Sequence, residues 1–228
     1  MQTLLLWDID GTLTLSGGAG MRALEAALQR EFGVGAPTPT KGIDFAGRTD
    51  TWIMRQIFAR IGLPDTAANL SRLLTAYLIE LPTALKNPGT CILPGVTVAL
   101  ETLAARGDCA QALLTGNVER GARIKLEHHG ISHFFAFGAF ADDSERRNDL
   151  GPVALRRARE KHGVEFAPER VFVIGDTPHD IECGKIIGAQ TIAVATGRYS
   201  TEELSAETPT VVLRDLSDTA AFLRAIGA

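Results

Sequence analysis

The chain has 228 residues, of which 45% are hydrophobic and 22% are charged, so it can bury a substantial core and lacks the composition of a disordered chain. This length predicts one large domain, or one domain that carries an insertion. The formal net charge of -4 lacks the basic excess of a protein that binds the phosphate backbone, which argues against nucleic acid as a partner.

Cysteine usage and hydrophobicity indicate the cellular compartment. Cys91, Cys109 and Cys183 are scattered and form no Cys-x-x-Cys pair, which argues against a disulfide framework or a structural zinc site. The first apolar run has no basic region before it and stops at Asp8, and no stretch reaches the roughly 20 apolar residues of a membrane-spanning helix. We therefore expect an unprocessed cytoplasmic protein with no membrane partner.

Near its start the chain carries the apolar run 4–7, followed by Asp8, Asp10 and Gly11. Such a run predicts a central strand of a parallel sheet, covered on both faces. Ligands of these sheets bind beyond the carboxyl ends of the strands, where the two acids fall. Two neighbouring carboxylates repel one another unless a cation joins them, and oxygen ligands favour Mg2+ over zinc. The alternative is that the acids only open a turn at Gly11.

Residues 16–88 show helical patterns and no strand pattern, and later segments alternate between helix and strand. The helices in the first block are expected at about 21–32, after the segment 47–50 with apolar residues from 52 to 61, and at about 67–85. Asp50 is expected to be the N-cap or a first-turn carboxylate of the second helix. Later helices are expected at about 96–106, 118–129, 150–162 and 181–187 and through residue 222, and strands at 109–114, 134–138, 171–174, 191–195 and 211–213. This alternation predicts an α/β protein with a doubly wound parallel sheet.

Polar residues follow three of the predicted strands. They are Asp8 with Asp10, the Thr115-Gly116-Asn117 turn, and Asp176 with Asp180. Because the carboxyl ends of parallel strands share one edge of the sheet, we expect these residues to meet there. A turn-only interpretation would require the same coincidence three times.

The residue types at this edge suit phosphoryl transfer. A carboxylate can attack phosphorus and form an aspartyl phosphate, and Asp8, at the strand end, is the predicted nucleophile. Mg2+ held by Asp8, Asp176 and a backbone carbonyl would neutralise the phosphoryl charge. Asp10 then suits general acid and base catalysis, first toward the leaving alcohol and then toward the attacking water.

The remaining polar residues have supporting roles in this hypothesis. Thr115 and Asn117 are expected to donate hydrogen bonds to phosphoryl oxygens, and Gly116 to line the same substrate-binding turn. Asp180 is expected to orient a metal-bound water or a basic side chain rather than to hold the metal itself.

This pattern resembles the haloacid dehalogenase superfamily of phosphohydrolases over nearly the whole chain. Residues 8–12 resemble its first motif, Thr115 its second and residues 175–180 its fourth. The resemblance implies a Rossmann-like core formed by 1–15 and 89–228. It implies that 16–88 is a helical cap of the kind found in the phosphoglycolate phosphatase and beta-phosphoglucomutase group. It also implies that the backbone carbonyl of Asp10 touches the metal.

The third motif of that family, commonly a lysine ahead of a helix, departs here. The corresponding stretch, 142–152, has no lysine, and counting back from a helix start near Leu150 puts Arg147 at the lysine's place. A guanidinium can contact phosphate and carboxylate oxygens, although it is not equivalent to an ammonium. Arg146 is the alternative, and a solvated charge run is an alternative for both arginines.

The predicted cap also contains a candidate specificity residue. The segment 47–50 resembles a cap loop whose arginine meets the far anionic end of a substrate, which makes Arg48 a substrate-binding candidate. The alternative is a surface charge paired with Asp50. His179, inside the fourth motif, is expected to line a loop rather than to catalyse.

Together these features predict a Mg2+-dependent phosphatase that acts on a small phosphorylated metabolite through an aspartyl phosphate on Asp8. A phosphomutase of the beta-phosphoglucomutase type would use the same residues. A 2-haloacid dehalogenase is disfavoured, since the resemblance implies that those enzymes lack the acid at the Asp10 position. A non-catalytic binding protein is the remaining alternative. The sequence leaves the substrate and the oligomeric state open.

Overall fold

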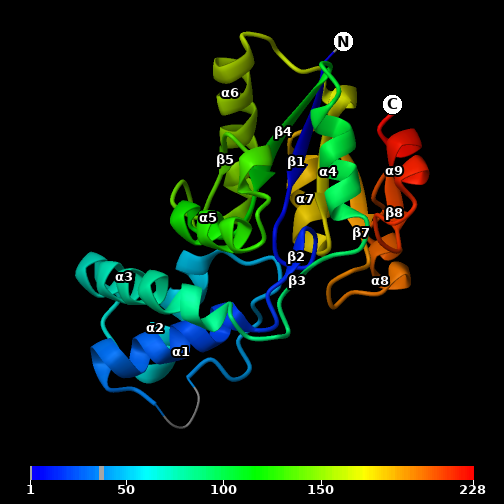
Figure 1. The fold of residues 1–228 in the computed structure, drawn as a ribbon. Helices are drawn as coiled ribbons and strands as arrows, with labels where there is room; N and C mark the ends of the chain where they lie inside the picture. Colours follow the sequence, from blue (N-terminus) through cyan, green and yellow to red (C-terminus); the bar gives the residue numbers. More distant parts are fainter. Residues whose placement is uncertain (1, 36–38) are drawn as a thin grey trace.

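The computed structural model describes residues 2–35 and 39–228, and its core is a six-stranded sheet in which every neighbouring pair is parallel (Figure 1). The strand order is β5-β4-β1-β6-β7-β8. The bounds are β1 Thr3–Trp7, β4 Cys109–Leu114, β5 Gly138–Ala139, β6 Val171–Gly175, β7 Gln190–Val194 and β8 Val211–Leu213. The chain runs outward from β1 to β4 and β5, then crosses back to β6 on the other side. That reversal is the switch point at which such sheets bind ligands.

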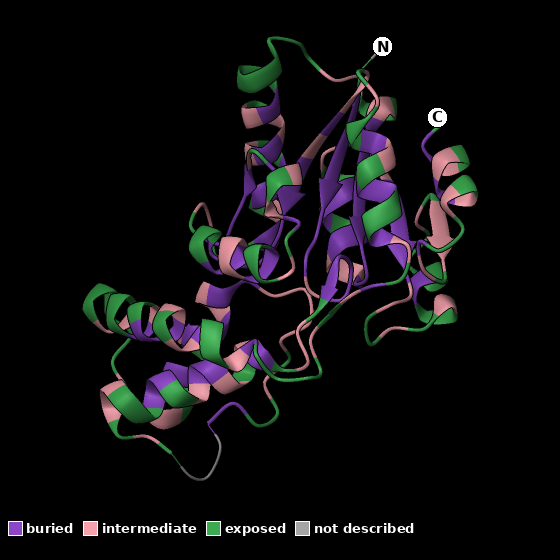
Figure 2. Cartoon of the chain, viewed as in Figure 1, coloured by how far each residue is buried: buried purple, intermediate pink, exposed green. Residues whose placement is uncertain are grey.

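Helices cover both faces of the sheet. Leu5 and Trp7 pack in one apolar cluster with α4 (Val96–Ala104), α5 (Glu119–His128) and α9 (Thr219–Ala225). Leu4 and Leu6 pack on the opposite face with α6 (Leu150–His162) and α7 (Pro178–Ile186). Every residue of β1 is therefore buried (Figure 2), which explains its continuous apolar run. No helix in the described ranges is both long and apolar enough to cross a bilayer.

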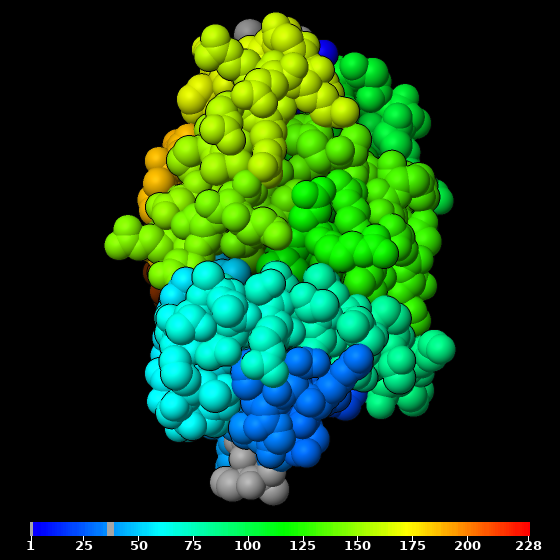
Figure 3. Space-filling view, turned by 90° about the vertical axis from the view of Figure 1, so that its left-hand side faces the viewer, coloured from blue at the N-terminus to red at the C-terminus, as the bar shows by residue number. Residues whose placement is uncertain are grey.

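Three helices form a cap. In the sequence, they lie between β1 and the remaining elements of the core. They are α1 (Ala19–Phe32), α2 (Asp50–Ile61) and α3 (Ala67–Ala84), and they share an apolar cluster of their own that also takes in Val118 and Ala141 of the core. The cap lies at the carboxyl ends of the strands (Figure 1) and abuts the core at α5 (Figure 3). A short antiparallel ribbon, β2 (Thr14–Leu15) with β3 (Cys91–Ile92), joins the two segments that enter and leave the cap.

The α/β class with a doubly wound parallel sheet and a helical cap is confirmed. The limits of the cap at residues 16 and 88 stay a prediction. The two strands of the β2–β3 ribbon lie just before residue 16 and just after residue 88. The sequence patterns missed this ribbon and the six-residue helix α8 (Thr201–Ala206).

One predicted strand is wrong. Residues 134–138 do not form a strand, because Ser132–Phe134 form a short 3-10 helix (η1) and β5 begins only at Gly138. Phe135 is nevertheless fully enclosed in the core. A short apolar run is buried in the same way in a turn as in a strand, so burial alone does not distinguish them. Two further 3-10 turns are η2 (Arg147–Asp149) and η3 (Pro168–Arg170).

Candidate active site

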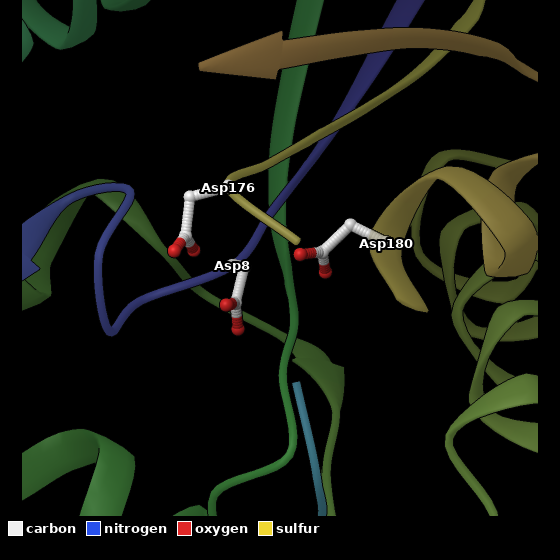
Figure 4. Close-up of side chains that lie close together, drawn as sticks. All are labelled: Asp8, Asp176 and Asp180. Atoms are coloured by element: carbon white, nitrogen blue, oxygen red, sulfur yellow. The ribbon is translucent and has the colours of Figure 1, made fainter. Parts of the chain in front are cut away.

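Three buried carboxylates converge at the carboxyl edge of the sheet (Figure 4). Asp8 follows β1, Asp176 follows β6, and Asp180 lies in the first turn of α7. One carboxylate oxygen from each lies within 4.8 Å of the others. The backbone N–H of Asp8 donates to the carbonyl of Ile174 at 3.0 Å, which continues the β1–β6 pairing into the site. Neighbouring strands therefore fix the positions of Asp8 and Asp176.

These acids lie in a setting that calls for positive charge. Burial raises the pKa of Asp8 to about 6, although the Arg147 guanidinium opposes that shift. Burial, reinforced by the Asp180 and Asp8 carboxylates, raises the pKa of Asp176 well above its ordinary value. A cation between the three would remove both penalties.

The space around Asp176 suits a metal ligand. A side chain at Gly11 or at Gly197 would overlap the Asp176 carboxylate, so both positions need glycine for this approach. Gly11 also has a left-handed backbone conformation, with φ of 83°. An all-oxygen donor set of buried carboxylates fits Mg2+.

Arg147 is the cation already present beside this cluster. Its Nη2 lies 3.1 Å from Oδ1 of Asp8, forms a second ion pair with Asp180 and donates to the carbonyl of Leu114 at 3.4 Å. Its side chain is buried, whereas Arg146 is exposed. Burial opposes the charged form, but Asp180 and Asp8 outweigh it and raise the pKa of Arg147. The structure thus brings Arg147, and not Arg146, to the predicted nucleophile.

Asp180 joins Arg147 to the start of α7. Its Oδ2 accepts hydrogen bonds from the backbone N–H of Thr177 at 3.0 Å and from the Thr177 hydroxyl at 2.6 Å. The Thr177 hydroxyl in turn caps α7 by accepting from the Asp180 N–H. With Oδ2 held in this capping box, Oδ1 contacts Arg147. Arg147 is thus the basic side chain that Asp180 orients here.

The carboxylate of Asp10 is not part of this group of three acids. Its Oδ2 accepts hydrogen bonds from the Lys125 ammonium and, at 3.0 Å, from the Asn117 amide. Lys125 also donates to Oδ1 of Asn117 at 3.2 Å. Burial would raise the pKa of Asp10, but Lys125 and Asn117 outweigh it and lower that pKa. A metal role for Asp10 therefore rests on its backbone carbonyl, as the family resemblance implies.

Sequence reasoning missed Lys125. Lys125 lies on the buried side of α5, together with Ala122 and Leu126, and is only 3% exposed. The sequence places this lysine on the apolar stripe of an amphipathic helix. Because lysine is rarely fully buried without a partner, that position could have indicated a buried ion pair. Asn117, predicted to bind phosphoryl oxygens, has both ends of its amide occupied by Asp10 and Lys125.

The Thr115–Val118 turn joins the core to the cap. The backbone N–H of Asp50 donates to the Gly116 carbonyl at 2.7 Å, and the Asp50 carboxylate accepts from the Val118 N–H at 2.8 Å. A side chain at Gly116 would overlap the backbone carbonyl of Arg48, so glycine is required there. Thr115 is buried at the start of this turn. The cap loop is thus hydrogen-bonded directly to the predicted substrate-binding turn.

The structure decides between the alternatives for two cap residues. Thr49 is the N-cap of α2, since its hydroxyl accepts from the Trp52 N–H at 3.2 Å, and Asp50 is the first-turn carboxylate. The suggested surface pair of Arg48 with Asp50 is wrong, because Asp50 is buried and its carboxylate accepts from the Val118 N–H. The Arg48 guanidinium instead lies 4.6 Å from the centre of the Trp52 ring. His179, Arg48 and Trp52 line a cavity of about 370 Å³ beside the site.

A larger cavity of about 530 Å³ opens between cap and core over the acids. It is lined by most of the predicted site residues, namely Asp8, Asp10, Arg48, Thr115, Gly116, Asn117, Arg147 and Asp176. Asp180 and His179 are outside its lining. Apart from Asp180, the site residues predicted at the three strand ends share one cavity with Arg48 and Arg147.

The C-terminal part of the chain, residues 147–219, matches the family model described as HAD-hydrolase-like. The tyrosine-protein kinase PtkA of Mycobacterium tuberculosis is 27% identical over 211 residues, which span 92% of this chain and 67% of that protein. The phosphoglycolate phosphatase of Pseudomonas putida is 26% identical over 221 residues, which span 93% of this chain and 76% of that enzyme.

A solved structure shares the fold. The crystal structure described as a predicted phosphoglycolate phosphatase from Haemophilus somnus superimposes with a TM-score of 0.73 over 97% of both chains. At 18% identity, this similarity concerns the arrangement of the sheet and the cap.

The buried carboxyl of Asp50 predicts a pH-dependent stability. Burial raises its pKa to about 6, with Lys125 opposing. The folded chain then binds a proton that the unfolded chain releases, so this contribution is fully present below about pH 4 and is lost as the pH rises through about 6. Asp50→Asn keeps an acceptor for Val118 and removes the charge. We expect it to raise the free energy of unfolding at pH 7 by roughly 1 to 3 kcal/mol.

Urea unfolding of both proteins between pH 4 and pH 8 measures this difference. Asp65→Asn, at an exposed carboxylate, is the matched control and should parallel the wild type. A constant difference between Asp50→Asn and wild type across this range would contradict the prediction.

Proposed function

We propose that the chain is a phosphatase of the haloacid dehalogenase superfamily, of the phosphoglycolate phosphatase-like kind. In this proposal it is a Mg2+-dependent enzyme that carries the phosphoryl group on Asp8. The observation that carries this proposal is the position of Asp8. It lies at the end of the central strand, among Asp176, Asp180 and Arg147, and lines the cavity under the cap.

Asp8, Asp176 and the backbone carbonyl of Asp10 are the proposed Mg2+ ligands. Bound there, the ion supplies positive charge to the phosphoryl oxygens. Asp180 is not among the proposed ligands, because its Oδ2 takes part in the capping box with Thr177 and its Oδ1 pairs with Arg147. Arg147 fixes one oxygen of Asp8, which leaves the other oxygen for attack on phosphorus.

In the first step, a carboxylate oxygen of Asp8 forms a bond to phosphorus, and the bond from phosphorus to the alcohol oxygen breaks. Asp10, protonated when this step begins, gives its proton to the departing alcohol oxygen, and Lys125 and Asn117 stabilise the carboxylate that forms. Thr115 lies at the adjoining strand end and is proposed to donate a hydrogen bond to a phosphoryl oxygen.

In the second step, water attacks the phosphorus of phospho-Asp8 and the bond to the Asp8 oxygen breaks. Ionised Asp10 takes the proton of that water, which restores the starting state. Lys125 and Asn117 favour the ionised form of Asp10 and hold its orientation. The cap covers the cavity in which both steps take place, and lids of this kind exclude bulk water.

Asp8→Asn is the direct test. The amide cannot carry a phosphoryl group, so we expect kcat with Mg2+ to fall by at least about 1,000-fold. Folding should be retained, since the substitution removes a buried charge. The measurement is the release of inorganic phosphate from a panel of metabolite phosphates.

The control for that test is Asp65→Asn, which makes the same change at an exposed site. A phosphomutase would instead convert beta-glucose 1-phosphate to its isomer faster than it releases phosphate. Full phosphate release by Asp8→Asn would rule out the proposed nucleophile.

Lys125→Met tests the support of Asp10. Loss of the ammonium leaves Asp10 without its charged partner, and we expect kcat to fall by about 10- to 100-fold with little change in KM. Lys125→Arg should recover part of this loss, because it restores the positive charge. Arg120→Met removes an exposed cation from the same helix and should match the wild type. An unchanged kcat in Lys125→Met would show that Asp10 acts without this partner.

A further inference from the structure

The cavity under the cap is large for a small substrate. Its volume of about 530 Å³ falls within the usual range of roughly 300–1,000 Å³ for sites that enclose whole drug-sized ligands. The phosphoryl group occupies only the end beside Asp8. The remaining volume is available to the alcohol part of the ester, so its lining reports on the chemistry of that part.

Much of this lining is apolar. It includes side chains from the ribbon, from α1, from the loop before α2 and from α2 itself, namely Leu15, Met21, Leu24, Ile43, Phe45 and Ile53. Leu15 is 43% exposed and Met21 is 42% exposed, although both are large apolar side chains. Exposed apolar side chains that gather around one cavity indicate an apolar ligand.

The cations that line the cavity are already engaged. Lys125 is paired with Asp10, and Arg147 with Asp8 and Asp180. Arg198 Nη1 lies 2.7 Å from Oδ1 of Asp44.

Arg48 lines both cavities, and its guanidinium contacts an aromatic ring. It lies over Trp52, a residue that lines the smaller neighbouring cavity and not this one. Among the described residues, the other lining cations are thus paired with carboxylates, and Arg48 is held by the Trp52 ring alone.

The charge balance points the same way. Five carboxylates line the cavity against four cationic side chains. A bound Mg2+ and the phosphoryl dianion would offset one another, and Asp10 is protonated when the first step begins, so the lining has no positive surplus for a second anion. Asp50, on the cap side, has no ion pair in the described part of the chain. A carboxylate on the alcohol part of a substrate would be buried among these apolar side chains, with Arg48 as the one lining cation in the described part of the chain that no carboxylate pairs.

We propose that the cavity accepts an uncharged, largely apolar alcohol group, so that the preferred substrates are phosphomonoesters of apolar alcohols rather than of hydroxy acids. This inference rests on the proposed phosphatase function. The proposed substrates differ from phosphoglycolate, the substrate in the name of the similar phosphoglycolate phosphatase.

Four esters test this proposal: ethyl phosphate, n-hexyl phosphate, the ω-carboxy analogue of hexyl phosphate, and phosphoglycolate. Ethyl and hexyl phosphate differ in apolar length, and hexyl phosphate and its analogue differ in the far charge. We expect kcat/KM for hexyl phosphate to exceed that for ethyl phosphate by at least about tenfold, since each buried methylene favours binding. The ω-carboxy analogue and phosphoglycolate should each lie at least about tenfold below hexyl phosphate.

Met21→Arg places a free cation at the cavity in an exposed position. We expect it to raise kcat/KM for the ω-carboxy analogue relative to hexyl phosphate by at least about tenfold. Met21→Gln has a similar size and no charge, and should leave that ratio near its wild-type value. Ile79→Arg adds the same charge at an exposed position of α3 outside the cavity and should not change the ratio.

The outcomes separate the two proposals. If phosphate is released but phosphoglycolate or the ω-carboxy analogue is preferred over hexyl phosphate, the apolar assignment is wrong and the phosphatase function stands. If none of the four esters nor any metabolite phosphate is hydrolysed with Mg2+, the phosphatase function fails and this inference fails with it.

Discussion

Electrostatic repulsion among Asp8, Asp176 and Asp180 is the constraint on which the rest of the site depends. Three buried carboxylates within 4.8 Å of one another are unfavourable unless positive charge lies among them. Arg147 provides part of that charge, and it contacts Asp8 and Asp180 but not Asp176. Burial and the neighbouring carboxylates raise the pKa of Asp176 well above its ordinary value, so a metal ion beside Asp176 would be stabilising.

The fold holds these repelling carboxylates in place through buried strands and helix-capping contacts. β1 is covered on both faces, so Asp8 begins at a fixed point, and the capping box of α7 fixes Asp180. The cap is bound to the same edge through two hydrogen bonds between Asp50 and the turn after β4. These hydrogen bonds join the cap directly to the turn that holds Thr115 and Asn117.

The sequence was most informative where side-chain chemistry and strand order agree. The run before Asp8 is apolar because both faces of β1 are covered, so the central strand and its terminal acids could be predicted. The contacts of Lys125 could not, because its pairing with Asp10 depends on how α5 packs. The direction of the Asp10 side chain and the burial of Asp50 were hidden for the same reason. The strand predicted at residues 134–138 was wrong because a buried turn and a short strand have similar apolar patterns.

The stereochemical course at phosphorus tests the central claim most directly. An isotopically chiral thiophosphate monoester, hydrolysed in isotopically labelled water, reports how many displacements occur. Transfer to Asp8 followed by attack of water inverts the configuration twice, so the account predicts net retention. Net inversion would show that water attacks the substrate directly, and it would contradict a phosphoryl group carried on Asp8.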